Sequence, residues 1–256
     1  MIHNNSEMTH SNIPPAKKIT REEVEGILSP LEPRFLTPLL SMYMGESQRG
    51  TDGALYPIDK STKISPSQGI WLYNFCLDII PQRTLEIGLA YGYSTIYFMA
   101  AAAKNRSGYH LAIDPYQTSH WNGIGYMHAR SLVAEDLSFK FIEDFAVQAA
   151  VDLKRAEETY DLIFIDGNHR FDDVLVDFSL YAPLCAMGGY IILDDLWMRS
   201  IQTVVAYIRA NREDFIEIPT DESNIAVFRK IGEDSRNWDH FKTFALVIPK
   251  YRTFKT

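Results

Sequence analysis

The central part of the chain alternates short apolar runs with stretches of helical periodicity. The apolar runs at 84–87, 109–113, 139–142, 161–165 and 190–193 are short and nearly continuous, which is typical of buried parallel strands. Helical spacing of apolar residues separates and follows these runs, near 94–104, 124–134, 145–155, 171–185 and 200–211. Such an alternation predicts a parallel sheet with helices on both faces.

The segment before the first strand is predicted to be helical and irregular. Thr20, followed by acidic residues, is typical of a helix start. Residues 21–46 are expected to form short helices, broken by Pro30, Pro33 and Pro38. Residues 45–63 are polar and contain glycine, so we expect a loop that covers an active site. A helix over 68–80 follows, with Pro66 in its first turn.

The end of the chain changes character. The runs 215–219 and 224–229 flank a polar turn at 220–223, which predicts an antiparallel hairpin. Beyond residue 232 the chain is rich in aromatic and aliphatic residues, so we expect this tail to pack on the core or on a second subunit. The predicted fold class is α/β: a doubly wound seven-stranded sheet with a C-terminal hairpin and an N-terminal helical extension.

Amino-acid composition excludes fewer classes of function than the pattern of apolar and polar positions does. The chain has 256 residues, 46% of them hydrophobic, and a net charge of −8. No basic run is present, which argues against nucleic acid and anionic membrane as partners. Cys76 and Cys185 lie in apolar patterns and are expected to be buried thiols in a reducing compartment. No apolar stretch is long enough to span a membrane, and residues 1–20 lack the apolar segment of a signal peptide, so we expect a cytoplasmic protein.

A glycine-containing turn follows the first predicted strand. Gly88 and Gly92 come directly after the strand, and Ser94 opens the next helical run. Such a turn lets a ligand approach the backbone closely, and the helix end offers free N–H groups to an anion. The spacing differs from the glycine pattern of dinucleotide-binding folds, which argues against an NAD(P) oxidoreductase.

The pattern Glu86-x-Gly-x-x-x-Gly-x-Ser94 resembles the first motif of class I S-adenosylmethionine-dependent methyltransferases. Five strand–helix units followed by an antiparallel hairpin is also their order of elements, in a Rossmann-like sheet. The resemblance implies that the turn holds the methionine part of the cofactor. The cofactor contacts implied at this turn are Glu86, Gly88, Ala90, Tyr91, Gly92 and Ser94.

Acidic residues stand just beyond the other predicted strands, at the edge where open parallel sheets bind ligands. Asp114 follows the second strand, and a carboxylate there can accept both hydroxyls of a ribose. The resemblance implies the same role for Asp114, although Asp-Pro is also an ordinary strand exit. Asp144 and Phe145 follow the third strand, where adenine usually lies in this fold. Each acid alone could also be a turn former or a helix cap.

Three further carboxylates are expected to converge at one rim. Asp166 ends the fourth strand, and Asp194 and Asp195 end the fifth. Neighbouring strands lie about 4.8 Å apart, so these groups would repel one another unless a hard divalent cation such as Mg²⁺ bound them. The alternative is structural: Asp195 caps the next helix, and Asp166 forms a side-chain turn.

The motifs Phe164–His169 and Ile192–Asp195 look like the metal motifs of the catechol O-methyltransferase-like and the macrocin- and novobiocin-type sugar O-methyltransferases. The run 114–125 resembles the bacterial sugar-modifying branch, and the resemblance covers about residues 60–200. It implies that Asp166, Asp194 and Asp195 hold Mg²⁺ or another divalent cation. Asp166 is then also expected to contact the cofactor and to take part in catalysis.

His169 stands where the catechol-type enzymes carry a lysine that is proposed as the base. Histidine titrates near neutral pH and could remove a hydroxyl proton, although a surface or helix-capping histidine is the alternative. Tyr91, Tyr93 and Trp121 are candidate neighbours of the sulfonium or the adenine, since aromatic faces attract cations. They fit packing roles equally well.

The expected function is therefore divalent-metal-assisted O-methylation of a small hydroxylated acceptor, a sugar hydroxyl ahead of a catechol or phenol. Two alternatives stay open: a non-methylating enzyme on the same fold, such as a hydroxylase-like relative or a lyase, and a binding scaffold. We expect a homo-oligomer. The predicted division of the chain is a disordered 1–20, a helical and lid extension at 21–64, a methyltransferase domain at 65–232 and a tail at 233–256.

Overall fold

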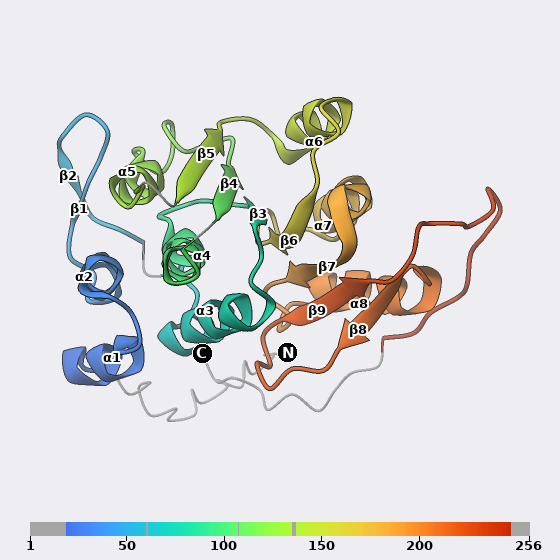
Figure 1. Cartoon of the computed structure of the whole chain (residues 1–256), viewed down its shortest axis with the longest axis horizontal. Coiled ribbons are helices and arrows are strands. Elements are labelled where there is room, and N and C mark those ends of the chain that lie inside the picture. Colours follow the sequence, from blue (N-terminus) through green and yellow to red (C-terminus); the bar gives the residue numbers. More distant parts are fainter. Residues whose placement is uncertain (1–18, 60, 107, 135–136, 247–256) are drawn as a thin grey trace, which may run out of the picture.

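A mixed β-sheet forms the centre of the fold in the computed structural model of the protein (Figure 1). The structure describes residues 19–59, 61–106, 108–134 and 137–246. Within them, seven strands form this sheet in the order β5-β4-β3-β6-β7-β9-β8. Strands β3 to β7 run parallel, β9 pairs antiparallel with β7, and β8 pairs antiparallel with β9. The strands are β3 (Arg83–Ile87), β4 (Tyr109–Ile113), β5 (Ser138–Ile142), β6 (Tyr160–Ile165), β7 (Cys185–Leu193), β8 (Phe215–Ile218) and β9 (Ala226–Lys230).

Helices cover both faces of the sheet, and each face has its own apolar core. One core joins helices α1 to α5 to the sheet, and the other joins α6 to α8. Strand β6 serves both, because Leu162 and Phe164 point into the first core while Ile163 and Ile165 point into the second. The predicted doubly wound fold is confirmed. The helices are α1 (Arg21–Leu28), α2 (Pro33–Tyr43), α3 (Pro66–Ile79), α4 (Tyr93–Lys104), α5 (Ile124–Ser131), α6 (Ala146–Arg155), α7 (Phe171–Tyr181), the short η1 (Ala182–Leu184) and α8 (Arg199–Asn211).

The strand order reverses between β3 and β6. From β3 the chain continues through α4 to β4 on one side, and from β6 it continues through α7 to β7 on the other (Figure 1). The helices that follow these two strands lie on opposite faces of the sheet. A crevice therefore opens beyond the carboxyl ends of β3 and β6, which is where ligands bind in open α/β sheets.

Some predicted boundaries are wrong. Pro33 opens α2 rather than breaking a helix, and Pro38 lies inside that helix. Pro38 removes the hydrogen bond to the carbonyl of residue 34, which lies in the exposed first turn and can be hydrated. The stretch 45–63 contains a small hairpin, β1 (Gln48–Arg49) and β2 (Leu55–Tyr56), instead of being wholly irregular.

Two helices are shorter than their apolar periodicity predicts. The helix expected over 171–185 ends at Tyr181, because the chain enters β7 at Cys185 and pairs with the start of β6 across a bulge. The helix expected over 124–134 ends at Ser131. Cys76 and Cys185 are both buried and free. Among the described residues, no helix is long and apolar enough to cross a membrane.

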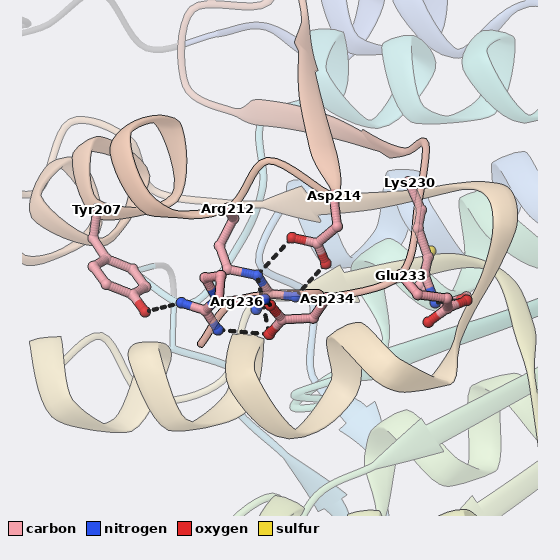
Figure 2. Close-up of polar contacts among 8 residues, drawn as sticks. Tyr207, Arg212, Asp214, Lys230, Glu233, Asp234 and Arg236 are labelled. Atoms are coloured by element: carbon pink, nitrogen blue, oxygen red, sulfur yellow. Dashed lines mark hydrogen bonds and ion pairs between the residues drawn. The ribbon is translucent and has the colours of Figure 1, made fainter. Parts of the chain in front are cut away.

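The segment after β9 contacts the end of α8 through polar groups (Figure 2). The guanidinium of Arg212, at the end of α8, binds both oxygens of Asp214 at 2.8 and 2.6 Å and lies 4.0 Å from Asp234. Arg236 binds both oxygens of Asp234 and donates to the hydroxyl of Tyr207 in α8 at 2.9 Å. Further along, the ring of Phe244 lies 5.9 Å from that of Tyr207, whereas Trp238 is 98% exposed.

Parts of two predicted segments lie outside the described residues. They are residues 247–256 of the tail and residues 1–18 of the predicted disordered 1–20, while Thr20 caps α1.

Acid pH should weaken the ion pair between Arg236 and Asp234. The hydrogen bonds of Arg236 lower the pKa of Asp234 to about 2, from an ordinary value of 3.8. A carboxylate with a lowered pKa stabilises the fold above its ordinary pKa and loses that contribution as the pH falls toward the lowered value. Because Asp234 is 39% exposed, Asp234→Asn should lower the free energy of unfolding at pH 7 by at most about 1 kcal/mol. Urea unfolding of wild-type protein and of Asp234→Asn at pH 7 and pH 3 measures this change in the free energy of unfolding, with Asp239→Asn as the control. A loss that stays constant over this range would contradict the ion-pair assignment.

Candidate active site

A cavity of about 1650 Å³ lies at the carboxyl ends of the parallel strands. The residues that follow β3, β4, β6 and β7 all contribute to its wall. Residues 61–65 and Gln68 close it from the side of α3, and 222–224 close it from the hairpin. The cavity reaches both faces of the sheet, since Tyr93 and Ser94 of α4 and Val176 and Asp177 of α7 line it.

The turn after β3 has a backbone conformation that side chains rarely adopt. Gly88 has φ +97°, Ala90 has φ +43°, and Gly92 has φ +85° where it caps the start of α4. A Cβ atom at Gly88 would lie 2.1 Å from the carbonyl oxygen of Asp166. Glycine is therefore required at this position by both the dihedral angle and the close approach of β6. Gly88, Ala90, Tyr91 and Ser94 line the cavity.

Asp114 holds this turn in place. Its Oδ2 accepts hydrogen bonds from the backbone N–H groups of Leu89 and Ala90, at 3.2 and 2.8 Å, and its Oδ1 accepts one from Tyr116 at 2.8 Å. Burial raises the pKa of Asp114, while these three donors act in the opposite direction. The side chain lines the cavity, and a carboxylate has capacity for a further donor such as a ribose hydroxyl.

Glu86 supports the turn from below instead of lining the cavity. The side chain is fully buried, with 0% exposure, and accepts hydrogen bonds from the hydroxyls of Ser94 (2.8 Å) and Thr95. His110 Nε2 lies 3.1 Å from its second oxygen. This carboxylate thus links the strand to the helix that follows it, and its contact with a cofactor stays a prediction.

Only one of the two residues predicted beside adenine reaches the cavity. The carboxylate of Asp144 is exposed and accepts from the N–H of Phe145 at 2.7 Å, and it does not line the wall. Phe145 does line the wall, edge-on to Tyr116, with ring centroids 5.8 Å apart. The prediction for Asp144 is corrected, because its side chain turns toward the start of α6.

Asp166, His169 and Asp195 form the group that could hold a metal ion. One ligand atom from each lies within 4.8 Å of the other two. His169 Nε2 is 2.7 Å from Asp195 Oδ2 and 3.4 Å from Asp166 Oδ1. The contacts with Asp166 and Asp195 raise the pKa of His169 to about 10. An imidazolium therefore supplies, in this structure, the positive charge that the two carboxylates require.

The two carboxylates of the group differ in their own titration. Burial raises the pKa of Asp166 to about 6, against the effect of the hydrogen bond from His169. Burial alone would also raise the pKa of Asp195, but the hydrogen bond and charge of His169 outweigh it and hold the pKa below its ordinary value. Asp195 also accepts from the indole N–H of Trp197 at 2.8 Å.

Asp194 adjoins this group and is held by donors of its own. Its Oδ1 accepts hydrogen bonds from Gln68 Nε2 (2.7 Å), Asn224 Nδ2 (3.0 Å) and the N–H of Asp195 (2.7 Å). Burial, followed by the charges of Asp166 and Asp195, raises its pKa well above the ordinary value. The group that could hold a metal ion thus includes His169 beside Asp166 and Asp195, and the role of Asp194 as a metal ligand stays a prediction.

The structural alternative for Asp195 is not observed. Helix α8 begins after Met198 without a side-chain cap, and Asp195, with φ +56°, lies four residues before its first residue, Arg199. Asp166 contacts the side chain of His169.

Residues that sequence reasoning missed at the site are Gln68, Asn224 and Trp197. Gln68 and Asn224 carry no local motif, whereas the position of Trp197 two residues after Asp195 was a usable signal.

Aromatic side chains form the rest of the wall. Tyr91 and Trp121 lie edge-on at 5.1 Å, and the hydroxyl of Tyr91 accepts from the N–H of Asp59 at 3.1 Å. Tyr93 is 4% exposed, and burial raises the pKa of its hydroxyl above its ordinary value. Trp197 is 58% exposed beside Asp195. The predicted aromatic neighbours Tyr91, Tyr93 and Trp121 therefore all line the same cavity.

Comparison with known proteins agrees with this arrangement. Residues 85–196 match the model of a methyltransferase domain family. A curated relative, an uncharacterized protein of Acanthamoeba polyphaga mimivirus, is 38% identical over 60 residues, which are 20% of this chain and 27% of that protein. The chain thus matches only about a quarter of that relative's length.

Solved methyltransferases share the fold at low sequence identity. A Podospora anserina methyltransferase with bound S-adenosylhomocysteine has a TM-score of 0.57 at 16% identity, over 87% of this chain and 100% of that one. A Bacillus cereus O-methyltransferase in complex with S-adenosylhomocysteine gives 0.59 at 16%, over 83% and 96%. The Streptomyces achromogenes O-methyltransferase of tomaymycin synthesis, in complex with S-adenosylmethionine, gives 0.54 at 19%, over 68% and 83%.

The fold is a doubly wound α/β sheet with a glycine turn at its switch point. Residues 85–196 of this sheet match the methyltransferase domain family, and the solved methyltransferases share the fold.

A side chain at Gly88 should disrupt the site. We expect Gly88→Ala to lower the free energy of unfolding by about 2–5 kcal/mol, because the methyl group would meet a backbone atom of β6 that cannot rotate away. Gly53→Ala is the matched control: Gly53 has φ +86° and no atom near its Cβ position, so it should lose only about 1 kcal/mol. Chemical denaturation of both variants measures this, and equal losses would rule out the close contact.

His169 should titrate far above neutral pH in metal-free protein. Nitrogen-detected NMR should show its imidazole protonated at pH 8, with a pKa near 10 that falls toward 6.5 in Asp195→Asn. Because the folded pKa is raised, the contact stabilises the fold fully below about pH 6.5 and loses this effect as the pH rises through 10. His128, whose pKa burial lowers to about 4, is an internal reference with the opposite shift. A neutral His169 at pH 8 would contradict the pairing.

Proposed function

We propose that the protein is a divalent-metal-assisted O-methyltransferase that acts on a hydroxyl group of a small acceptor. One observation carries the proposal: the glycine turn with Asp114 and the group of Asp166, His169 and Asp195 line one cavity, at the ends of neighbouring strands. A methyl donor at the turn and a hydroxyl at the acidic group would meet between them. Holding both reactants in one geometry is itself a large part of catalysis.

The donor residues fit a hard cation. Carboxylate oxygens of Asp166 and Asp195 are ligands that Mg²⁺ prefers, and the imidazole of His169 lies beside both of them. Bound there, a divalent ion would lower the pKa of the acceptor hydroxyl and orient its oxygen. The raised pKa of His169 supports this assignment, since it reflects the demand of the two carboxylates for positive charge.

Residues of the chain would bind the methyl donor and accept the proton. The turn at 88–94 and the start of α4 would bind the methionine part of S-adenosylmethionine, whose sulfonium carries the transferable methyl group. Asp114 would accept from the ribose, and Tyr91 with Trp121 would face the positive sulfonium. His169 would accept the hydroxyl proton when a cation has replaced its own proton between the carboxylates.

A sugar or glycosylated metabolite is the favoured acceptor. Trp197 offers an exposed aromatic face beside Asp195, and Gln202, Glu222 and Asn224 place polar groups around it. An aromatic face with several polar partners suits a ring that carries many hydroxyls. A catechol or phenol is the alternative acceptor, and its flat ring would also pack on Trp197. We further propose a cytoplasmic location and a homo-oligomer, for which the acidic composition and the exposed Trp238 and Phe241 are the support.

Substitution of the metal-binding acids should separate cofactor binding from turnover. Asp166→Asn and Asp195→Asn should reduce methylation about 100-fold or more, since several kcal/mol of transition-state stabilisation would be lost. Calorimetric titration should show S-adenosylmethionine binding little changed in both variants. Asp172→Asn, which changes an exposed acid at the rim of the same cavity, is the control.

The same assay tests the metal and the acceptor. Product analysis by mass spectrometry, with Mg²⁺ or with a chelator, should detect methylated sugar acceptors only in the presence of the metal. Full turnover in the chelator would remove the metal from the proposal. Absence of S-adenosylmethionine binding under both conditions would overturn the proposed function itself and favour a binding scaffold.

A further inference from the structure

One buried carboxyl group in the cavity has no partner. Asp177 lies in the middle of α7, is 6% exposed and lines the cavity wall. Within the part of the chain that the structure describes, neither a hydrogen-bond donor nor a cation lies beside its carboxyl oxygens. The other acids of this wall are satisfied: backbone N–H groups bind Asp114, amide groups bind Asp194, and an imidazole binds Asp195. Asp177 therefore offers a free acceptor to a ligand.

Apolar and polar side chains line the cavity that Asp177 reaches. Ile87, Phe145, Val147 and Val176 are among the apolar ones, and Asp173 lies on the same wall. Gly167 is next to the carboxyl group, because a Cβ atom built there would lie 3.8 Å from Asp177 Oδ2. Burial, aided by the charge of Asp173, raises the pKa of Asp177 to about 7. A buried acceptor without a donor is unfavourable, so a ligand that brings an N–H group would be bound preferentially.

The course of the cavity indicates which part of a ligand reaches this point. The cavity runs from the start of α4, on one face of the sheet, past Asp114 to the side of α6 and α7, on the other face. S-adenosylmethionine carries three kinds of donor: an ammonium, two ribose hydroxyls and the 6-amino group of adenine. With the methionine part at the turn and the ribose at Asp114, the donor left for the α6–α7 side is the 6-amino group. A flat base with one polar edge also matches apolar walls around a single acceptor.

We propose that Asp177, which lines the cavity beside Gly167, accepts a hydrogen bond from the 6-amino group of the cofactor's adenine. Asp177 thus takes the adenine-recognising role that the strand-end pattern had given to Asp144. Either protonation state of a carboxyl group keeps an oxygen that can accept. The inference rests on the proposed function, since it takes S-adenosylmethionine as the ligand.

A ligand pair and a variant pair test this contact together. The ligands are S-adenosylhomocysteine and its analogue with hydrogen in place of the 6-amino group, titrated calorimetrically into the full chain with Mg²⁺. Wild-type protein should bind the analogue about tenfold more weakly or worse, because Asp177 would stay unpaired. Asp177→Leu should weaken S-adenosylhomocysteine binding by a similar factor and leave the analogue nearly unchanged. Preference for the amino group should then disappear in this variant.

Two further variants separate the hydrogen bond from charge and packing. Asp177→Asn removes the charge but keeps an acceptor oxygen, so it should retain the preference for S-adenosylhomocysteine. Asp173→Asn removes a charge one turn earlier on α7, on the same cavity wall, and should also retain it. Equal affinity of wild-type protein for both ligands, or an unchanged preference in Asp177→Leu, would overturn the assignment while the cofactor site stands. If wild-type protein binds neither ligand, both this inference and the proposed function fall.

Discussion

The close contact between Gly88 and the carbonyl of Asp166 is the constraint on which the rest of the site depends. It joins the first residues beyond β3 and β6, the two strands between which the order of the sheet reverses. The cofactor turn and the metal-binding group therefore share one backbone contact. Their separation is set by the spacing of hydrogen-bonded strands, about 4.8 Å, instead of by flexible loops. A rigid separation is what a direct transfer between two bound groups requires.

Crowding of carboxylates is the consequence of this geometry. Strands that end together bring their terminal acids together, and each acid needs a donor or a positive charge. Glu86 is satisfied by hydroxyl groups, Asp114 by backbone N–H groups and Asp194 by side-chain amides. These three are held by neutral donors that belong to the scaffold. Asp166 and Asp195 depend instead on the proton of His169, which can leave.

The sequence predicts which strand ends form this site better than it predicts where their side chains point. Continuous apolar runs locate the strands, and residues just beyond them must lie at one edge, so Asp114, Asp166 and Asp195 could be placed from the pattern alone. The direction of each side chain could not be placed. Asp194 and Asp195 are adjacent, and the left-handed backbone at Asp195 (φ +56°) sends one toward the amides and the other toward His169.

Hydrogen-bond partners from distant elements could not be predicted from short stretches of sequence. Gln68 lies 126 residues from Asp194, and Asn224 lies 30 residues from it, so their contacts appear only when the sheet is assembled. Glu86 belongs to a recognisable motif, yet the motif does not tell whether its carboxylate faces the ligand or the helix. Asp177 has the spacing of an ordinary helical residue, and only the assembled fold shows that it lines the cavity beside Gly167.

The two sides of the cavity differ in where their residues come from. The donor side is built from the turn after β3 and from Asp114, all within the matched methyltransferase segment. The acceptor side takes residues 61–65 and Gln68 from before that segment, and 222–224 from the hairpin after it. These outer pieces can change without disturbing the contact at Gly88. Acceptor choice is thereby separated from methyl-donor binding, since a new acceptor requires a different rim on an unchanged frame.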